Sequence, residues 1–385
     1  MKKNRNYVFS SESVTDGHPD KVCDQISDSI LDAALSQDRF SRVACETMVK
    51  TNFVALAGEI TTKTKINYRA IVSETLKRIG YTQKGIGFDI DSIELIDRIS
   101  EQSPDISQGV TEGNEREQGA GDQGMMMGYA SNETIELMPL PIMLAHGLTR
   151  KLREVRVNGI VDYLRPDGKS QVAVNYVNGK PVSLKNIVLA AHHSEMISLK
   201  KLREELLEIV IKPICHNYMT KSTEVFINAT GKFEIGGPAA DAGVTGRKII
   251  VDTYGSKGRH GGGAFSGKDP SKVDRSGAYA ARYIAKNIVA SGLADRVEVQ
   301  LAYCIGVAKP TSICIDTFGT SKLDEALLEK AVMKIFPVKP KEIIGKLGLL
   351  DFHNYKDTAA FGHFGREEFP WEKIDKVENL LNYFH

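Results

Sequence analysis

The sequence predicts an α+β protein made of three similar α/β units. Segments in which apolar residues recur at helical spacing alternate with pairs of segments in which apolar and polar residues alternate. The order helix, strand pair, helix occurs three times, at a spacing of about 120 to 130 residues. With 385 residues, 42% of them apolar, the chain is long enough to give each unit a core. We therefore expect a pseudo-threefold arrangement, with the sheets packed inward and the helices outward.

Three consecutive parts of the chain are expected to hold these units. We place the N-terminal unit at 1–105, the central unit at 106–232 and the C-terminal unit at 233–385. Residues 102–124 are polar, rich in glycine and without periodicity. A loop of this length in a compact chain is usually functional, commonly a lid, or else disordered.

In the N-terminal unit, a helix is predicted to begin at Pro19, because proline fits the first helical position. Apolar residues follow at helical spacing, at Val22, Ile26, Ile30 and Ala33. Alternation at 43–50 and 53–60 predicts a hairpin that turns at Thr51-Asn52. A second helix is predicted over 67–79, ended by Gly80.

The other two units follow the same plan. The central unit is expected to contain a helix at 141–155, a hairpin over 162–176 that turns at 166–169, a tight turn at Asn178-Gly179, a long helix over 197–218 and a strand at 224–229. The C-terminal unit is expected to contain a strand at 248–252, a helix at 274–291 ended by Gly292, strands at 297–307 and 312–318 and a helix at 323–335.

The composition argues against several classes of partner. Fifty basic and forty-nine acidic residues leave a net charge of +1, which gives no electrostatic signature for nucleic acid or an anionic membrane. The five cysteines are scattered and indicate neither a disulfide framework nor a zinc site. No segment resembles a signal peptide or a membrane span. We expect a cytoplasmic protein that binds small molecules.

The segment Gly-Gly-Gly-Ala-Phe-Ser-Gly-Lys-Asp at 261–269 carries the strongest functional signal. Glycines let main-chain N–H groups approach an anion, the following helix N-terminus adds partial positive charge, and Lys268 and Lys272 supply cations. It is not a Walker A loop, because Asp269 follows Lys268 where that loop has Ser or Thr. A mobile surface loop would explain this segment alone, but a second segment of similar chemistry favours a site for a polyphosphate and its metal.

That second segment is Asp-Gly-His-Pro-Asp-Lys at 16–21, which opens the first predicted helix. His18 and Asp20 therefore lie at a helix N-terminus, and Asp20 is a hard oxygen ligand of the type that Mg²⁺ prefers. Alternatively, Asp20 only complements the helix dipole and His18 only caps the helix. A third loop, at 236–248, adds further small residues with Asp241, Arg247 and Lys248.

Two carboxylates are predicted to share one face of the first hairpin. With a turn at Thr51-Asn52, Glu46 lies opposite Ala57, and Glu59 lies diagonally across on the same face. Such like charges are either solvated or held by a cation or an amine. The small uncharged residues around them suit a surface that another group approaches.

These loops together suit a reaction that grips a whole triphosphate chain. The cations Arg247, Lys248, Lys169, Lys268 and His18 face the carboxylates Asp20, Asp274, Asp241, Glu46 and Glu59. Such a set can neutralise charge that builds on phosphate oxygens in a transition state. Nothing in the sequence resembles a Ser-His-Asp or Cys-His nucleophile, so positioning and electrostatics would do the work.

Four long motifs resemble the signature segments of the S-adenosylmethionine synthetase family, in the family's order and across nearly the whole chain. They lie at 10–28, 119–124, 236–241 and 261–269. The resemblance implies that the methionine sulfur attacks the ribose C5′ of ATP. The released triphosphate is then hydrolysed to diphosphate and phosphate. One departure is Asp16, where the family more often has Glu, and this keeps the charge.

The resemblance also implies roles for individual residues. His18 would lie by the breaking C–O bond, and Lys169, Arg247, Lys248 and Lys268 would bind the phosphates. Asp20 and Asp274 would hold two Mg²⁺ per site, and Glu46 would help bind one K⁺. The positions that resemble those facing methionine are Glu59, Gln102, Asp122, Asp241 and Lys272, and those around the nucleotide are Asp167, Lys232 and Phe233. Ala264 is a further predicted substrate-binding residue.

The family implies an assembly as well: a homodimer with shared active sites, commonly doubled to a homotetramer, with 102–124 as a gate over the site. Two other functions fit the loops alone. An ATP-dependent kinase or phosphohydrolase could use the same glycine-rich and cationic segments. A binding module that holds an anionic ligand without turnover is the third alternative.

Overall fold

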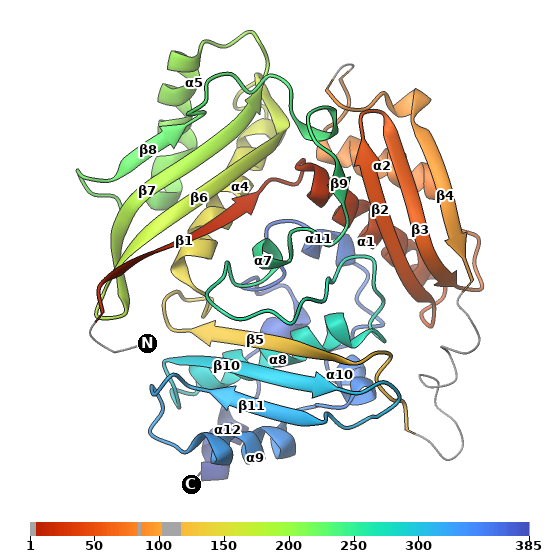
Figure 1. Ribbon diagram of the computed structural model, residues 1–385, viewed down its shortest axis with the longest axis vertical. Helices are drawn as coiled ribbons and strands as arrows, with labels where there is room; N and C mark the ends of the chain where they lie inside the picture. Colours follow the sequence, from red (N-terminus) through yellow and green to blue (C-terminus); the bar gives the residue numbers. More distant parts are fainter. Residues whose placement is uncertain (1–4, 84–85, 102–116, 385) are drawn as a thin grey trace.

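Three units that share the order strand, helix, strand pair, helix make up the fold (Figure 1). The computed structural model describes residues 5–83, 86–101 and 117–384. The first unit comprises β1 (Tyr7–Val14), α1 (Pro19–Gln37), β2 (Arg42–Lys50), β3 (Phe53–Thr61), α2 (Tyr68–Ile79), a 3₁₀ turn (Ile90–Ser92) and β4 (Glu94–Ser100). The second comprises β5 (Gly124–Ser131), α4 (Leu140–Val157), β6 (Leu164–Val177), β7 (Lys180–His193), α5 (Leu199–Leu206), a π-helical turn (Leu207–Ile211), α6 (Lys212–Cys215) and β8 (Glu224–Ile227).

The third unit repeats the plan and is followed by a helical tail. It comprises a 3₁₀ turn (Gly237–Ala239), β9 (Gly243–Val244), α7 (Ile249–Asp252), α8 (Val273–Ala290), β10 (Arg296–Tyr303), β11 (Ser312–Asp316) and α9 (Glu325–Ile335). The tail comprises α10 (Pro340–Lys346), α11 (Tyr355–Thr358), a 3₁₀ turn (Pro370–Glu372) and α12 (Val377–Phe384). The predicted fold class, three similar α/β units, is confirmed. None of the helices in the described part of the chain is long and apolar enough to cross a lipid bilayer.

The units exchange strands in a cycle. The three sheets have the strand orders β1-β6-β7-β8, β11-β10-β5 and β4-β3-β2-β9. The strand that opens each unit therefore pairs, antiparallel, with the hairpin of another unit: β1 with β6, β5 with β10 and β9 with β2. Each sheet is complete only when two units contribute to it.

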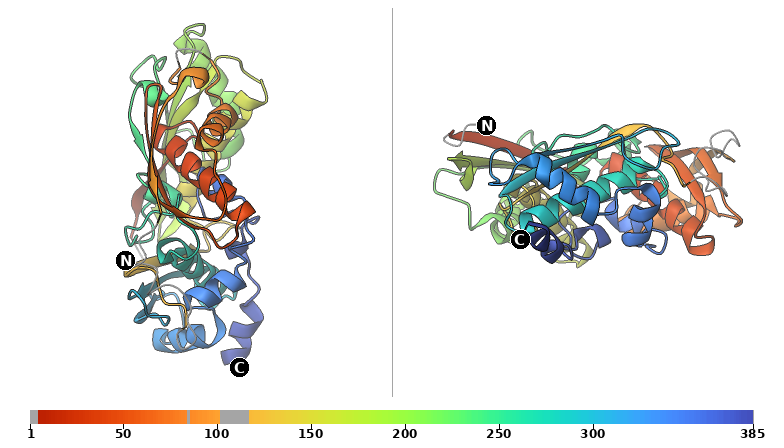
Figure 2. Two further views of the ribbon diagram at one scale, coloured as in Figure 1. Left: turned by 90° about the vertical axis from the view of Figure 1, so that its right-hand side faces the viewer. Right: turned by 90° about the horizontal axis from the view of Figure 1, so that it is seen from below.

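The sheets and helices form two layers. In the side views of Figure 2 the helices lie mostly to one side of the three sheets. One apolar core is shared by the first and third units, where Ile26 of α1 and Tyr279 of α8 belong to the same cluster, and a second core fills the central unit. Because α1 and α8 are buried along most of their length, they are fixed supports for the loops that precede them.

Most predicted elements are present, and the register of the first hairpin is confirmed, with Glu46 opposite Ala57. Two predictions are wrong. Residues 166–169 do not turn, because β6 continues through them and Lys169 lies opposite Val14 of β1 and Ala190 of β7. The hairpin turns instead at Asn178-Gly179, where both residues have positive φ.

The apolar run at 248–252 is a helical turn and not a strand. Its backbone bonds are local, since the Asp252 amide donates to the Lys248 carbonyl at 2.9 Å and the Gly255 amide to the Ile250 carbonyl at 3.1 Å. This turn buries the side chains of Val251 and Asp252. The predicted helix over 197–218 is present, but a π-helical turn interrupts it.

Candidate active site

The N-terminus of α1 places His18 and Asp20 beside the loop that contains β9. Proline at the first helical position fixes the start of the helix, and His18 caps it by accepting the Asp20 amide on Nδ1 at 3.2 Å. The Asp20 carboxylate accepts the Val244 amide at 3.0 Å and pairs with Lys248 Nζ at 2.6 Å. Arg247 Nε lies 3.9 Å from the same carboxylate. Three of the predicted phosphate and metal residues thus meet at this point.

The two side chains at the helix start differ in charge. Burial, and then the charge of Lys248, lowers the pKa of His18 to about 3, so its imidazole is neutral at neutral pH. Burial acts to raise the pKa of Asp20, but the hydrogen bonds from Lys248 and the Val244 amide outweigh it, and the pKa is lowered. The site therefore holds a neutral histidine beside an ionised carboxylate.

The glycine-rich loop lies along the edge of β2 that faces away from β3. Lys268 forms a bridge with Ala44, and the Cys45 amide donates to the Gly267 carbonyl at 2.9 Å. Gly267 has φ +80°, and a Cβ there would lie 2.0 Å from the Cys45 carbonyl oxygen, so the close approach requires glycine. At the end of the loop, Lys268 Nζ pairs with Asp274 of α8 at 2.6 Å. The predicted phosphate lysine and metal carboxylate are adjacent.

The loop at 236–248 covers the rest of the same edge. Val244 pairs with Met48, and the Thr245 amide donates to the Thr47 carbonyl at 3.0 Å. A Cβ on Gly246 would lie 2.7 Å from the Cβ of Ala264. The two loops therefore run side by side on β2.

A row of buried carboxylates on α1 holds both loops in place. Asp20, Asp24, Asp28 and Asp32 are spaced four residues apart, which puts them on one helix face, and all are buried. Asp24 accepts the Gly246 amide at 2.9 Å, and Asp28 accepts the Gly267 amide at 2.8 Å. These anchors were not predicted from the sequence. The four-residue spacing of the aspartates places them on one helix face but does not indicate that this face is buried.

Each buried carboxylate in the row has a partner. Arg275 of α8 donates to the two oxygens of Asp28 at 2.7 and 2.9 Å. Lys21 donates to Asp24 at 2.9 Å and to Asp252 of α7, and these two charges outweigh burial and raise the pKa of Lys21. Burial raises the pKa of Asp252 to about 7. These ion pairs tie α1, α7 and α8 into one support beneath the loops.

Strand β6 brings two more predicted residues toward this region. Asp167 accepts the Gly237 amide at 2.7 Å, and burial raises its pKa to about 6. Lys169 is close enough for its charge to act on both Asp167 and His18. Phe233 stacks on His192, with 5.3 Å between ring centres, close to Gly236. Lys232 pairs with Glu234 at 3.1 Å and is largely exposed.

Known proteins match the chain over nearly all of its length. The family models for the N-terminal, central and C-terminal domains of S-adenosylmethionine synthetase match residues 6–104, 117–233 and 235–373. The S-adenosylmethionine synthase of Sorangium cellulosum (strain So ce56) is 55% identical over 379 residues, which cover 98% of this chain and 90% of that protein. The S-adenosylmethionine synthase of Desulforudis audaxviator (strain MP104C) is 55% identical over 386 residues, which cover 97% of this chain and 98% of that protein.

The chain belongs to the S-adenosylmethionine synthetase family. The family resemblance seen in the four sequence motifs is confirmed.

Several other residues that resemble S-adenosylmethionine synthetase positions are not among the contacts described above. Glu46 and Glu59 are exposed on one face of the β2-β3 hairpin, and Asp122 is exposed just before β5. Asp241 is exposed at the start of the loop that leads into β9. Lys272 pairs with Asp269 at 2.5 Å. Gln102 and most of the predicted gate at 102–124 lie outside the described residues.

S-adenosylmethionine synthetases typically use Mg²⁺ and K⁺, and the residues present fit Mg²⁺. In the described ranges, no group of three or more His, Cys, Asp or Glu side chains forms a ready metal site. Mg²⁺ is usually bound through one or two carboxylates together with substrate phosphates and water. Asp20 and Asp274, each now paired with a lysine at 2.6 Å, match that mode of binding.

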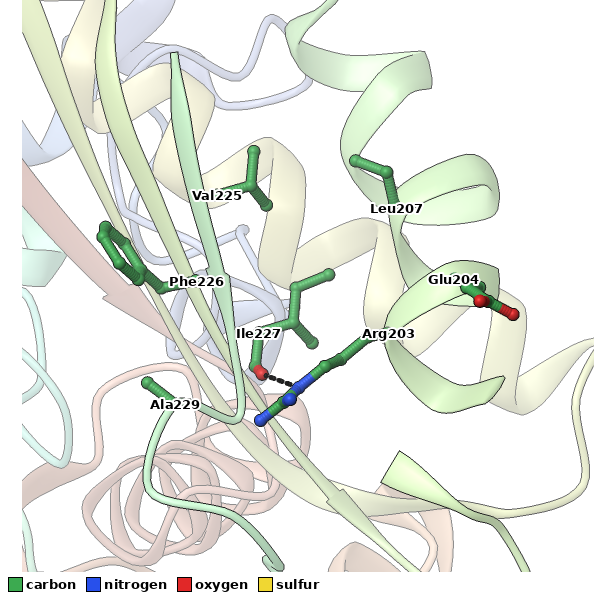
Figure 3. A pocket seen from close by; sticks show the side chains of 7 residues that line it. All are labelled: Arg203, Glu204, Leu207, Val225, Phe226, Ile227 and Ala229. Atoms are coloured by element: carbon green, nitrogen blue, oxygen red, sulfur yellow. Dashed lines mark hydrogen bonds between the residues drawn. The ribbon is translucent and has the colours of Figure 1, made fainter. Parts of the chain in front are cut away.

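One apolar pocket lies away from this site. It has a volume of about 450 Å³ and lies between α5 and β8 of the central unit, where Leu207 and Val225 line it (Figure 3). Its arginine, Arg203, is already bonded to the carbonyls of Ile227 and Asn228, both at 2.8 Å. None of the residues that resemble S-adenosylmethionine synthetase site positions lines it.

Proposed function

We propose that the start of α1 and the two loops on β2 form the site at which this chain joins the adenosyl group of ATP to the sulfur of L-methionine. This is the S-adenosylmethionine synthase activity of its family. The observation that carries the proposal is a pair of ion contacts: Asp20 of α1 meets Lys248 and Arg247 of one loop, and Asp274 of α8 meets Lys268 of the other. The same proposal includes hydrolysis of the triphosphate to diphosphate and phosphate.

The charges suit an attack by a thioether. Methionine sulfur carries no proton, so no general base is needed, and the barrier lies in the charge that develops on the departing triphosphate. Lys169, Arg247, Lys248 and Lys268 would neutralise that charge. Their present carboxylate partners hold two of them in place, which avoids the cost of orienting them during the reaction.

His18 has a specific part in this mechanism. Its Nδ1 accepts the Asp20 amide, so the single proton of the neutral imidazole is on Nε2. An Nε2–H donor beside the breaking C–O bond would stabilise the leaving oxygen by a hydrogen bond, without transferring its proton. The low pKa favours this donor because a neutral imidazole does not compete with the lysines for the phosphates.

The ions and the other substrate residues complete the proposal. Asp20 and Asp274 would hold two Mg²⁺ per site, which would polarise the phosphoryl oxygens, and Glu46 would help hold one K⁺. Glu59, Gln102, Asp122, Asp241 and Lys272 would face methionine. Asp167, Lys232, Phe233 and Ala264 would surround the nucleotide.

We further propose a homodimer with shared sites, commonly doubled to a homotetramer. The sheet face that carries Glu46, Glu59 and Met48 supports this, because it is exposed and combines carboxylates with apolar surface. A second subunit packed on that face would cover the apolar surface and contact the carboxylates. We also expect a cytoplasmic protein and a gate at 102–124.

Mass spectrometry of the products tests the reaction. Incubation with ATP, L-methionine, Mg²⁺ and K⁺ should give the sulfonium product together with diphosphate and phosphate. Omission of methionine should abolish nucleotide consumption, and chelation of Mg²⁺ should abolish product. ADP or phosphate formed without methionine consumption would support a kinase or phosphohydrolase instead. Nucleotide binding with no product would support a binding module.

A further inference from the structure

A second cation-rich hollow lies among the helices, away from the proposed active site. It has a volume of about 280 Å³ and is lined by parts of α1, α2, α4 and the segment 356–368. Its cations are Arg78, Arg150, Arg153, Lys356 and Arg366. Its acids are Asp16, Asp357 and Glu368. The cations therefore outnumber the acids, and we call this hollow the basic pocket.

Only some of the cations in the basic pocket form close ion pairs with its acidic residues. Arg153 Nε donates to Asp16 at 2.7 Å, and Arg366 Nε donates to Glu368 at 2.9 Å. Arg78 has only a long contact with Asp357, 3.8 Å from Nη1, and its buried Nη2 has no hydrogen-bond partner among the described residues.

Two further cations lack a carboxylate altogether. Within the ranges that the structure describes, neither the Arg150 guanidinium nor the Lys356 ammonium has an ion pair or hydrogen bond. The Arg150 guanidinium lies over the Phe361 ring, 6.0 Å from its centre. The basic pocket thus presents cationic groups that no described protein group pairs with at hydrogen-bond distance.

Leaving the buried part of the Arg78 guanidinium without a partner is costly. Burial lowers the pKa of Arg78, although the charges of Asp357 and Asp16 oppose the shift. Arg150 is exposed, so solvent screens its charge in the absence of a ligand. Arginine nevertheless stays protonated in proteins, so the cost appears as lost stability and not as loss of charge. A bound anion would remove it. Phe361, at the wall, has φ +64°, a conformation that is strained for an aromatic residue and is found preferentially at ligand-binding positions.

We propose that the basic pocket binds a compact anion with two phosphoryl groups, either free diphosphate or the diphosphate part of a nucleotide. Two guanidinium forks and an ammonium match phosphate oxygens in charge and geometry, and the volume admits a small polyanion but not an extended one. The inference goes beyond the proposed reaction. The proposed catalytic residues lie on β6, at the start of α1 and on the two loops along β2, and the basic pocket shares with them only the backbone that joins Asp16 to His18.

Isothermal titration calorimetry with inorganic diphosphate in the presence of EDTA tests the proposal. Without Mg²⁺, the carboxylates of the proposed active site cannot bind diphosphate through a metal ion. The basic pocket needs no metal, because its own side chains supply the positive charge. The variants are Arg150→Ala with Lys356→Ala, and the control is Lys200→Ala with Lys221→Ala, which removes the same charge from exposed positions. We expect the pocket variant to weaken diphosphate binding by about tenfold or more, since each lost contact is charge-assisted. The control should bind as the unaltered protein does.

A thermal unfolding measurement checks that the variants are folded. Loss of two unpaired like charges should leave the melting temperature of the pocket variant unchanged or higher. Diphosphate should raise the melting temperatures of the unaltered protein and the surface control more than that of the pocket variant. If the double variant does not fold, the single charge-retaining change Arg150→Lys replaces it and should still weaken binding, because it loses the fork.

The remaining outcomes decide the source of the anion or overturn the proposal. Tighter binding of ADP than of diphosphate, lost in Phe361→Ala, indicates a nucleotide. Equal binding of both indicates free diphosphate. If the pocket variant binds diphosphate as the surface control does, or if Lys268→Ala alone abolishes the metal-free binding, the anion occupies the proposed active site and the basic pocket is not a site.

Discussion

Asp20 and Asp28 lie on the same face of α1, eight residues apart, but their partners differ in one respect. Asp28 is sealed against Arg275, and neither side chain is more than 1% exposed. Asp20 pairs with Lys248, which is 20% exposed, and lies near Arg247, which is 56% exposed. The first pair cannot separate without leaving a buried charge, whereas the second can turn toward a ligand. Partner exposure, not residue type, thus distinguishes the carboxylate that supports the loops from the one that we propose holds Mg²⁺.

Breaking the sealed pair should have the largest effect. Asp28→Ala leaves Arg275 buried without its carboxylate and the Gly267 amide without its acceptor, and should lower the free energy of unfolding by about 3–5 kcal/mol. Denaturant unfolding measures this. Asp28→Leu combined with Arg275→Met should recover much of the loss, because no buried charge is left unpaired. A loss below about 1 kcal/mol for Asp28→Ala would show that the sealed pair is not a support.

Breaking the exposed pairs should instead reduce turnover. Lys268→Ala and Asp20→Asn should each lower kcat by about 10²–10³-fold, equivalent to about 2.7–4 kcal/mol, because each removes charge that stabilises the leaving triphosphate or its metal. Steady-state assays of product formation measure this, and circular dichroism checks that folding survives. Near-normal turnover in both variants would refute the proposed site.

The neutral His18 should make stability depend on pH. Its folded pKa of about 3 lies below the ordinary value, so below about pH 6.5 the unfolded chain binds a proton that the folded chain does not. This contribution is therefore complete above that pH and is lost as the pH falls toward 3. Relative to His18→Asn, the unaltered protein should lose about 2 kcal/mol between pH 7.5 and 5 in denaturant unfolding. An unchanged difference between the two proteins would show that His18 titrates normally.

The exposed carboxylates of the first hairpin should matter least to the fold. Glu46→Gln and Glu59→Gln should change the free energy of unfolding by less than about 0.5 kcal/mol, since both side chains are exposed. If the proposed substrate contacts are right, Glu59→Gln should raise the KM for methionine while stability stays constant. A large loss of stability in either variant would place that carboxylate among the supports.

The local parts of the fold could be predicted because their causes are local. Pro19 and the apolar residues behind it specify α1, and alternation with a two-residue turn specifies the β2-β3 register. The Pro-Asp-Gly-Lys run at 166–169 has typical turn residues, yet it stays within β6, because Gly168 and Lys169 pair with β7 and Lys169 also pairs with β1. The β-branched residues of α7 were misleading because the buried contact between Asp252 and Lys21 overrides their propensity.

The loops of the site could be predicted from glycine and charge, but their anchors could not. Aspartates at four-residue spacing on an amphipathic helix ordinarily indicate a solvated face, and here Asp24 and Asp28 are fully buried. Their burial depends on Arg275 and on amides more than 200 positions away in the chain, as the pairing of Asp28 with the Gly267 amide shows. The cyclic exchange of strands is a long-range feature of the same kind.

That exchange has a consequence for synthesis on the ribosome. Strand β2 emerges early, but β9, which pairs with its edge, is not made until residue 244. At about 5–20 residues per second, the nascent chain waits roughly 10 to 40 seconds with this edge bare. An uncovered strand edge is a template for pairing with other chains. During synthesis this strand edge is therefore open to such pairing for longer than it would be if β9 followed β2 directly in the chain.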